Sequence, residues 1–190
     1  MSGTADANGS TFVLAQKYVG ERVTTALERI DPKAIARAVD LLVRAPQVFV
    51  YGAGRSGIIG RAFAMRLVQA GLRAYVIGES VTPIVRQHDA VFILSAQGES
   101  SSSTQTANIA RREGAEVIVL TARPESKIAH TASLLIPVEF GEDPDRRRFA
   151  PLGTLFESAS LRLTDALIAE LLRVRGETED SMRRRHAIMV

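Results

Sequence analysis

Glycine, arginine and serine occur together in the run from Gly52 to Gly57, which reads Gly-Ala-Gly-Arg-Ser-Gly. Glycines let a backbone approach a ligand closely, and the free N–H groups at a helix start attract an anion. Gly54, Arg55 and Ser56 are therefore candidate phosphate-binding residues. The run also satisfies the Gly-x-Gly-x-x-Gly pattern of dinucleotide-binding folds, and a tight strand-to-helix turn without a ligand would use the same glycines.

A second polar run extends from Ser95 to Thr104 and is rich in side-chain hydroxyls. We expect it at another parallel-strand end, where hydroxyls and backbone N–H groups would form a second anion-binding corner beside the first. Ser95, Gln97 and Ser100 are the candidate ligands here, although Ser100 would alternatively serve only as a helix cap. A nicotinamide dinucleotide does not need such a turn, so the two runs together favour a monophosphorylated ligand.

Five short apolar runs predict the strands that would position these turns. Their apolarity is continuous rather than alternating, which is typical of strands covered on both faces. Helix-length connections such as Ser56–Ala70 and Ser101–Arg112 indicate right-handed parallel crossovers. We therefore expect an α/β fold, a three-layer α/β/α sandwich with a five-stranded parallel sheet. The predicted strands are Val48–Tyr51, Ala74–Ile77, Val91–Leu94, Val117–Leu120 and Leu134–Val138.

Helical spacing of apolar residues predicts further elements on either side of this strand pattern. The segments Val19–Ile30 and Pro32–Ala45 predict two antiparallel helices before the first strand, with Pro32 in the first turn of the second. A long helix is predicted over Pro151–Arg175, and a short one over Thr178–Arg185. The fold should therefore combine N-terminal helices, the sheet and a long C-terminal helix.

The composition is that of an ordinary globular protein of 190 residues, with 46% hydrophobic and 24% charged residues. We expect a flexible N-terminus over residues 1–10 and a single domain over 11–190. No apolar run approaches the about 18 residues of a membrane-spanning helix, so we expect a cytoplasmic protein that does not bind membranes. The absence of cysteine and the wide spacing of three histidines argue against a metal site, and we expect no metal or other cofactor.

The isoelectric point near 9.7 raises the alternative of a nucleic-acid-binding protein. The basic residues are scattered along the chain except for two arginine triplets, Arg146–Arg148 and Arg183–Arg185. The sequence also has no tryptophan that could stack on a base. Solvated surface or salt bridges between subunits explain such triplets more simply. We therefore expect a small phosphorylated ligand and no nucleic acid.

The motifs described above resemble those of the sugar isomerase (SIS) domain family. The resemblance lies in Gly52–Ser56, Ser95–Ser100, Gly114–Thr121 and Ser126–Ala129. Further segments are similar to family members that interconvert 3-hexulose 6-phosphate and fructose 6-phosphate, the second step of formaldehyde fixation through ribulose monophosphate. These segments are Ala62–Leu67, Gly78–Pro83, Ala150–Glu157, Asp165–Glu170 and Arg185–Ala187. The resemblance implies a flavodoxin-like sheet and a homotetramer with active sites near the subunit interfaces.

The resemblance also assigns roles to individual residues. It implies that Ser56, Ser95 and Ser100 are phosphate-binding hydroxyls, and that Gln97 replaces a serine that the family usually has in that turn. An amide can still donate a hydrogen bond, so we expect phosphate binding to survive this change. Glu157 matches the family's catalytic glutamate. From the sequence alone, this glutamate would equally be a helix-start carboxylate that interacts with the helix dipole.

Three more residues are candidates for contacts with the sugar part of the ligand. His186 matches a C-terminal histidine that the resemblance places near a neighbouring subunit's site, although it would also suit a polar tail. Thr82 and Glu79 lie in a segment expected near the sugar hydroxyls. One carboxylate that accepts and returns a proton is sufficient for isomerisation through a 2,3-enediol. An isomerase of another phosphosugar and a non-catalytic phosphosugar sensor stay open as alternatives.

Overall fold

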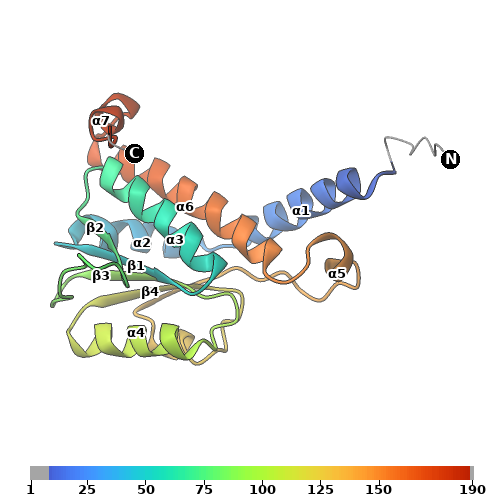
Figure 1. Ribbon diagram of the computed structural model, residues 1–190, viewed down its shortest axis with the longest axis horizontal. Helices are drawn as coiled ribbons and strands as arrows, with labels where there is room; N and C mark the ends of the chain where they lie inside the picture. Colours follow the sequence, from blue (N-terminus) through green and yellow to red (C-terminus); the bar gives the residue numbers. More distant parts are fainter. Residues whose placement is uncertain (1–8, 189–190) are drawn as a thin grey trace.

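A five-stranded parallel sheet forms the centre of the molecule in the computed structural model, which describes residues 9–188 (Figure 1). The strand order is β2-β1-β3-β4-β5, and every neighbouring pair is parallel. The predicted parallel sheet is thus confirmed. The strands are β1 (Val48–Gly52), β2 (Ala74–Val76), β3 (Ala90–Leu94), β4 (Glu116–Thr121) and β5 (Leu134–Pro137).

Helices cover both faces of this sheet, which confirms the three-layer architecture (Figure 1). Side chains of β1 alternate between two cores: Val48 and Val50 pack toward α3 and α6, whereas Phe49 packs toward α4. Because both faces are buried, the strands are apolar at successive positions. The helices are α1 (Thr11–Glu28), α2 (Pro32–Arg44), α3 (Arg55–Gln69), α4 (Ser101–Arg112), α5 (Arg146–Phe149), α6 (Thr154–Arg175) and α7 (Glu179–Arg184), with a 3-10 turn over Ala129–Thr131.

The strand order changes direction between β1 and β3, because the next strand is added on opposite sides of this pair. The chain leaves β1 through α3 toward β2 on one side, and it leaves β3 through α4 toward β4 on the other. Gly52 at the end of β1 pairs with Leu94 at the end of β3, so the two following turns begin beside each other. In open α/β sheets, ligands bind at such a switch point, outside the carboxyl ends of the strands.

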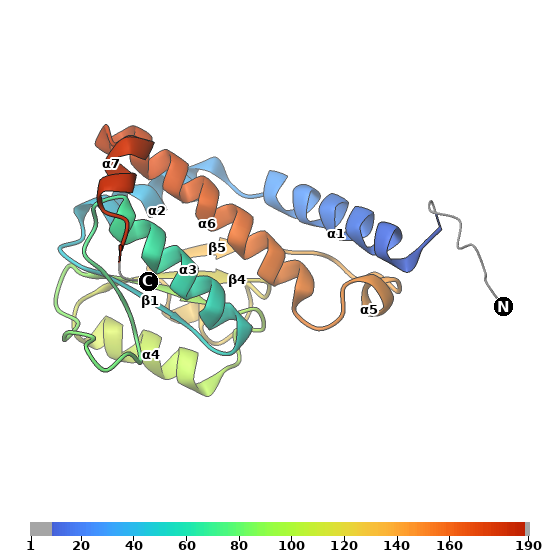
Figure 2. The ribbon, with the colours of Figure 1, turned by 45° about the horizontal axis from the view of Figure 1, so that its top comes forward.

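The two N-terminal helices do not form the predicted antiparallel pair. Figure 2 shows α1 reaching beyond the sheet, with α5 beside it. The main contacts of α1 are with α6 and α5, and its buried residues Val23 and Ala26 join the core that α6 also lines. Tyr18 of α1 donates a hydrogen bond of 3.0 Å to Asp143 near α5. The buried residues of α1 therefore pack with α6 instead of α2, and helical periodicity alone does not distinguish between these two partners.

The predicted flexible N-terminus, residues 1–10, falls mainly outside the described residues. Of this segment, Ser10 is the N-cap of α1, and its hydroxyl accepts a hydrogen bond from the Val13 N–H. Within residues 9–188, no helix has the length and apolarity that are required to cross a membrane.

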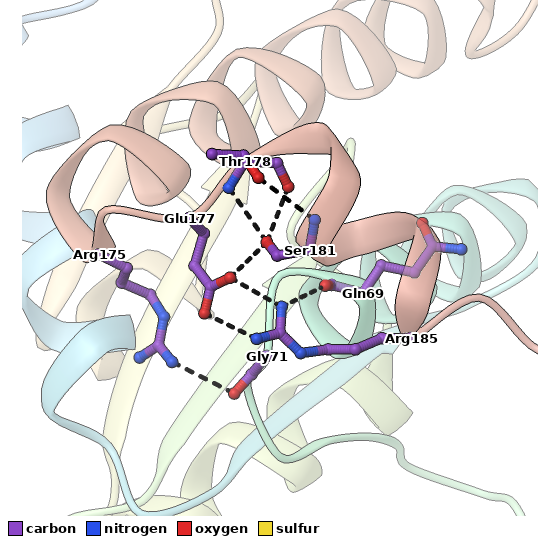
Figure 3. Close-up of polar contacts among 7 residues, drawn as sticks. All are labelled: Gln69, Gly71, Arg175, Glu177, Thr178, Ser181 and Arg185. Atoms are coloured by element: carbon purple, nitrogen blue, oxygen red, sulfur yellow. Dashed lines mark hydrogen bonds and ion pairs between the residues drawn. The ribbon is translucent and has the colours of Figure 1, made fainter.

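Three residues, Glu177, Ser181 and Arg185, form what we call the C-terminal clamp (Figure 3). The Arg185 guanidinium donates to the two Glu177 carboxylate oxygens at 2.9 and 2.8 Å, and also to the backbone carbonyl of Gln69 at 3.1 Å. The Ser181 hydroxyl donates to Glu177 as well. Thr178 caps α7 and forms a capping box with Ser181. The clamp thus fixes α7 to the C-terminal end of α3.

Hydrogen bonds from Arg185 and then from Ser181 lower the pKa of Glu177 from 4.5 to about 2. A carboxyl whose pKa is depressed on folding stabilises the native state above its unfolded pKa. That contribution is lost as the pH falls from 4.5 toward about 2, because the unfolded chain then binds the proton first. The clamp should therefore weaken in acid.

Replacing Glu177 with glutamine should lower the melting temperature at neutral pH, because Arg185 loses its charged partner. The difference in melting temperature between the variant and the wild type should become smaller as the pH falls from 4.5 toward about 2. Thermal denaturation followed by circular dichroism across this range measures both effects. Glu21→Gln is the control, because Glu21 pairs with Lys17 at 3.8 Å and both side chains are exposed. A difference that stays constant across the acid range would contradict the prediction.

Candidate active site

The turn between β1 and α3 is built by glycines that allow the backbone to close on itself. A Cβ on Gly52 would lie 2.8 Å from the Gly57 nitrogen, and a Cβ on Gly57 would collide with the Gly52 carbonyl. Gly54 has φ 58° and ψ −133°, a conformation that other residues rarely adopt. Steric demand alone therefore explains the glycine pattern, without a dinucleotide.

This turn leaves donors open at the start of α3. Gly54 is the N-cap and supplies no side-chain cap. Among the described residues, the N–H groups of Arg55 and Ser56 have no hydrogen-bond acceptor. Unpaired N–H groups at a helix start carry partial positive charge and suit a phosphate. The half-buried Ser56 side chain lies at this position, as the sequence predicts.

The turn between β3 and α4 supplies the second group of polar residues. Ser95 follows β3 and is buried, whereas Gln97 is exposed. Gly98 has φ 65°, and a Cβ on it would overlap the Ser126 side chain. Ser100 is the N-cap of α4, because its hydroxyl accepts from the Ser103 N–H at 3.4 Å. The capping role that the sequence left open for Ser100 is therefore present.

Glu157 reaches the β1–α3 turn from the first turn of α6. Its Oε2 lies 2.7 Å from Nε of Arg55, and its side chain is 12% exposed, against 71% for Arg55. The carboxylate bends back over the helix start, where a Cβ on Gly153 would lie 2.8 Å from Oε1. The structure thus brings Glu157 to the same turn as Arg55 and Ser56, although these residues are far apart in the sequence.

Glu79 and Thr82 lie in the segment that follows β2, and Glu79 reaches the middle of α3. Glu79 forms an ion pair of 2.7 Å with Arg61 of α3. The Thr82 hydroxyl donates to the carbonyls of Val76 at 2.6 Å and Glu79 at 2.8 Å. Both functional groups are thus engaged by the protein itself, and they stabilise the loop after β2.

His186 lies at the opposite end of α3 from the two turns. It is exposed and lines a surface depression with Arg66 and Gln69, next to the C-terminal clamp. Because an α-helix rises about 1.5 Å per residue, the fifteen residues of α3 place that end roughly 20 Å from Arg55. Within one chain, His186 is therefore not part of the site that contains Glu157. Its contribution to a neighbouring subunit's site stays a prediction.

The sequence did not single out two residues beside the candidate site. Gly153 provides the space into which the Glu157 carboxylate bends, and the only signal for it is the Gly-x-x-x-Glu spacing at a helix start. Lys127 lies 3.8 Å from Glu99 of the second turn, so it adds an exposed cation there. The only sequence signal for Lys127 is its place in the segment Ser126–Ala129.

The arrangement combines an anion site with an acid–base group. Helix-start N–H groups and hydroxyls of two adjacent turns can bind a phosphate, and the Glu157 carboxylate beside the first turn is a group that can accept and return a proton. Among residues 9–188, no group of three histidine, aspartate or glutamate side chains is placed to bind a metal ion. The chemistry that the site's own residues offer is proton transfer on a phosphorylated molecule.

Comparison with known proteins identifies the family. The SIS domain model matches residues 41–145. A 3-hexulose-6-phosphate isomerase of Methylomonas aminofaciens is 34% identical over 90% of this chain and 96% of its own length. Another from Bacillus subtilis is 37% identical over 78% of this chain and 82% of its own.

The structural comparison agrees. A crystal structure from Methanococcus jannaschii, for which a molecular function of 3-hexulose-6-phosphate isomerase was inferred, superposes with a TM-score of 0.83. It is 27% identical, and the match covers 92% of this chain and 98% of that one. The sequence match and the shared architecture lead to one conclusion: the chain belongs to the SIS domain family.

Proposed function

We propose that this chain is a sugar phosphate isomerase that interconverts 3-hexulose 6-phosphate and fructose 6-phosphate. The observation that carries the proposal is the position of the Glu157 carboxylate, 2.7 Å from Arg55 at the open start of α3. The names of the two curated relatives support the choice of substrate. In a cell, this reaction would be the second step of formaldehyde fixation through ribulose monophosphate.

The phosphate binds, on this proposal, between the two strand-end turns. The N–H groups of Arg55 and Ser56 donate to it from the start of α3, where the helix dipole favours negative charge. The hydroxyls of Ser56, Ser95 and Ser100 and the amide of Gln97 add further donors. Each such residue lies in one of the two turns that the Gly52–Leu94 pairing places side by side.

Glu157 then moves the proton that isomerisation requires. It takes the proton from C2, and the electron pair of that C–H bond forms the C2–C3 double bond while the C3 carbonyl becomes an enediolate oxygen. The O2–H proton passes to this C3 oxygen as the C2 carbonyl forms, and Glu157 returns its proton to C3. Substrate and product are isomers, so the step needs no co-reactant.

The developing charge on the enediol oxygens needs a donor as well. Within one chain, the backbone N–H groups and the hydroxyls of the turns are the nearest donors. We further propose a homotetramer in which His186 of a neighbouring subunit approaches this site, since His186 lies far from Glu157 in its own chain. A protonated imidazole would then stabilise the oxyanion.

Glu157→Gln should lower turnover of 3-hexulose 6-phosphate at least about a hundredfold, because the amide cannot accept the C2 proton. The substrate is made in place from formaldehyde and ribulose 5-phosphate by a separate synthase, and fructose 6-phosphate formation is measured. Glu170→Gln is the matched control, because Glu170 lies on the same helix and bonds only to Arg173 among the described residues. Full activity of the folded Glu157→Gln protein would refute the assignment. No turnover by a folded wild-type protein would refute the activity and favour another phosphosugar or a sensor.

Gly153→Ala should lower kcat by about tenfold or more, because the new Cβ would displace the Glu157 carboxylate that lies 2.8 Å away. The melting temperature should change little, because the backbone at Gly153, with φ −89°, suits alanine. Steady-state kinetics and thermal denaturation separate the two effects. Gly20→Ala is the control, since nothing lies within 4 Å of a Cβ there. An unchanged kcat would show that the carboxylate position is not critical.

A further inference from the structure

Arg55 stands between two possible partners for its positive charge. One is the Glu157 carboxylate, with 2.7 Å between Nε and Oε2. The other is an anion bound at the start of α3, the helix whose first residue is Arg55. Among the described residues, Glu157 is the only ion-pair partner of the Arg55 side chain. One exposed cation therefore pairs with the proposed base and also begins the helix whose N–H groups would bind the phosphate.

The two members of this ion pair differ in freedom of movement. The Arg55 side chain is 71% exposed, whereas the Glu157 side chain is 12% exposed and is confined beside Gly153. If the pair opens, Arg55 is thus the member that moves. An exposed arginine can turn about its side-chain bonds without disturbing the core, since α3 faces the sheet with other residues, such as Phe63 and Leu67.

We infer that Arg55 is a phosphate-operated latch on Glu157. While the phosphate site is empty, the guanidinium pairs with the carboxylate. When a phosphorylated sugar binds, Arg55 turns to the phosphate and releases the carboxylate for proton transfer. That Glu157 is the base rests on the function proposed above, but the exchange of partners is a property of the binding site itself.

The relative strength of the two contacts makes the exchange favourable. The guanidinium of Arg55 is largely solvated and meets a single negative charge in Glu157, so water screens their attraction from the arginine side. A phosphate dianion offers more negative charge and several acceptor oxygens, which suit the forked guanidinium. Binding of the phosphate, a part of the substrate that does not react, would thus prepare the catalytic group. A sugar without a phosphate would leave Glu157 paired, so the latch selects phosphorylated substrates.

Affinity for inorganic phosphate, measured by titration calorimetry, tests the latch without any turnover. Glu157→Gln should bind phosphate about threefold to fivefold more tightly than wild type, because the competing carboxylate is gone. Arg55→Ala should bind phosphate more weakly. In the Arg55→Ala background, Glu157→Gln should have no further effect, because the competition acts through Arg55.

Three results would overturn the latch: no phosphate binding by wild type, no gain in Glu157→Gln, or a gain that persists without Arg55. The last would indicate simple repulsion between carboxylate and phosphate. Asp40→Asn is the charge-matched control, because Asp40 pairs with Arg37 and Arg44 on α2. Melting curves confirm folding, and Arg55→Gln replaces Arg55→Ala if the alanine variant unfolds. Turnover is measured separately, so loss of the proposed activity and loss of the latch are distinguishable.

Discussion

The close contact between Gly52 and Gly57 is the constraint on which the candidate site depends. It draws the start of α3 against the end of β1, so no side chain fits between them. Gly54 then turns the chain with a positive φ and leaves the helix start without a cap. Because β1 pairs in register with β3 up to Gly52 and Leu94, the hydroxyl-rich turn begins beside this helix start.

The core determines where the acid–base group lies. Leu155 and Phe156 of α6 are buried immediately before Glu157, and they anchor the first turn of that helix in the core that α3 also lines. Glu157 is consequently held at the edge of the core, where only its carboxylate approaches Arg55 and solvent. A proton-transfer group benefits from such a fixed position, since small displacements are costly for catalysis. The packing of α6 on α3 is thus as important to the proposed function as the turns are.

Local patterns predicted the parts of the structure that local physics controls. Continuous apolar runs identified all five strands, and Pro32 marked the start of α2, because burial on two faces and a fixed φ have direct sequence signals. The course of α1 could not be predicted, because its apolar stripe fits α6 as well as α2. The Arg55–Glu157 pair, the space beside Gly153 and the distance to His186 depend on how α3, α6 and α7 pack, and no short-range pattern encodes that packing.

A crystal structure with bound fructose 6-phosphate tests most directly whether the two turns and Glu157 form one site. The account predicts the phosphate at the N–H groups of Arg55 and Ser56, with the Ser95–Ser100 turn on its other side. It also predicts the Glu157 carboxylate within about 3.5 Å of C2 or C3. A sugar phosphate bound elsewhere, such as along the outer side of α4 near Lys127, would contradict the account. A sugar bound in the site with its C2 and C3 out of reach of Glu157 would contradict it as well.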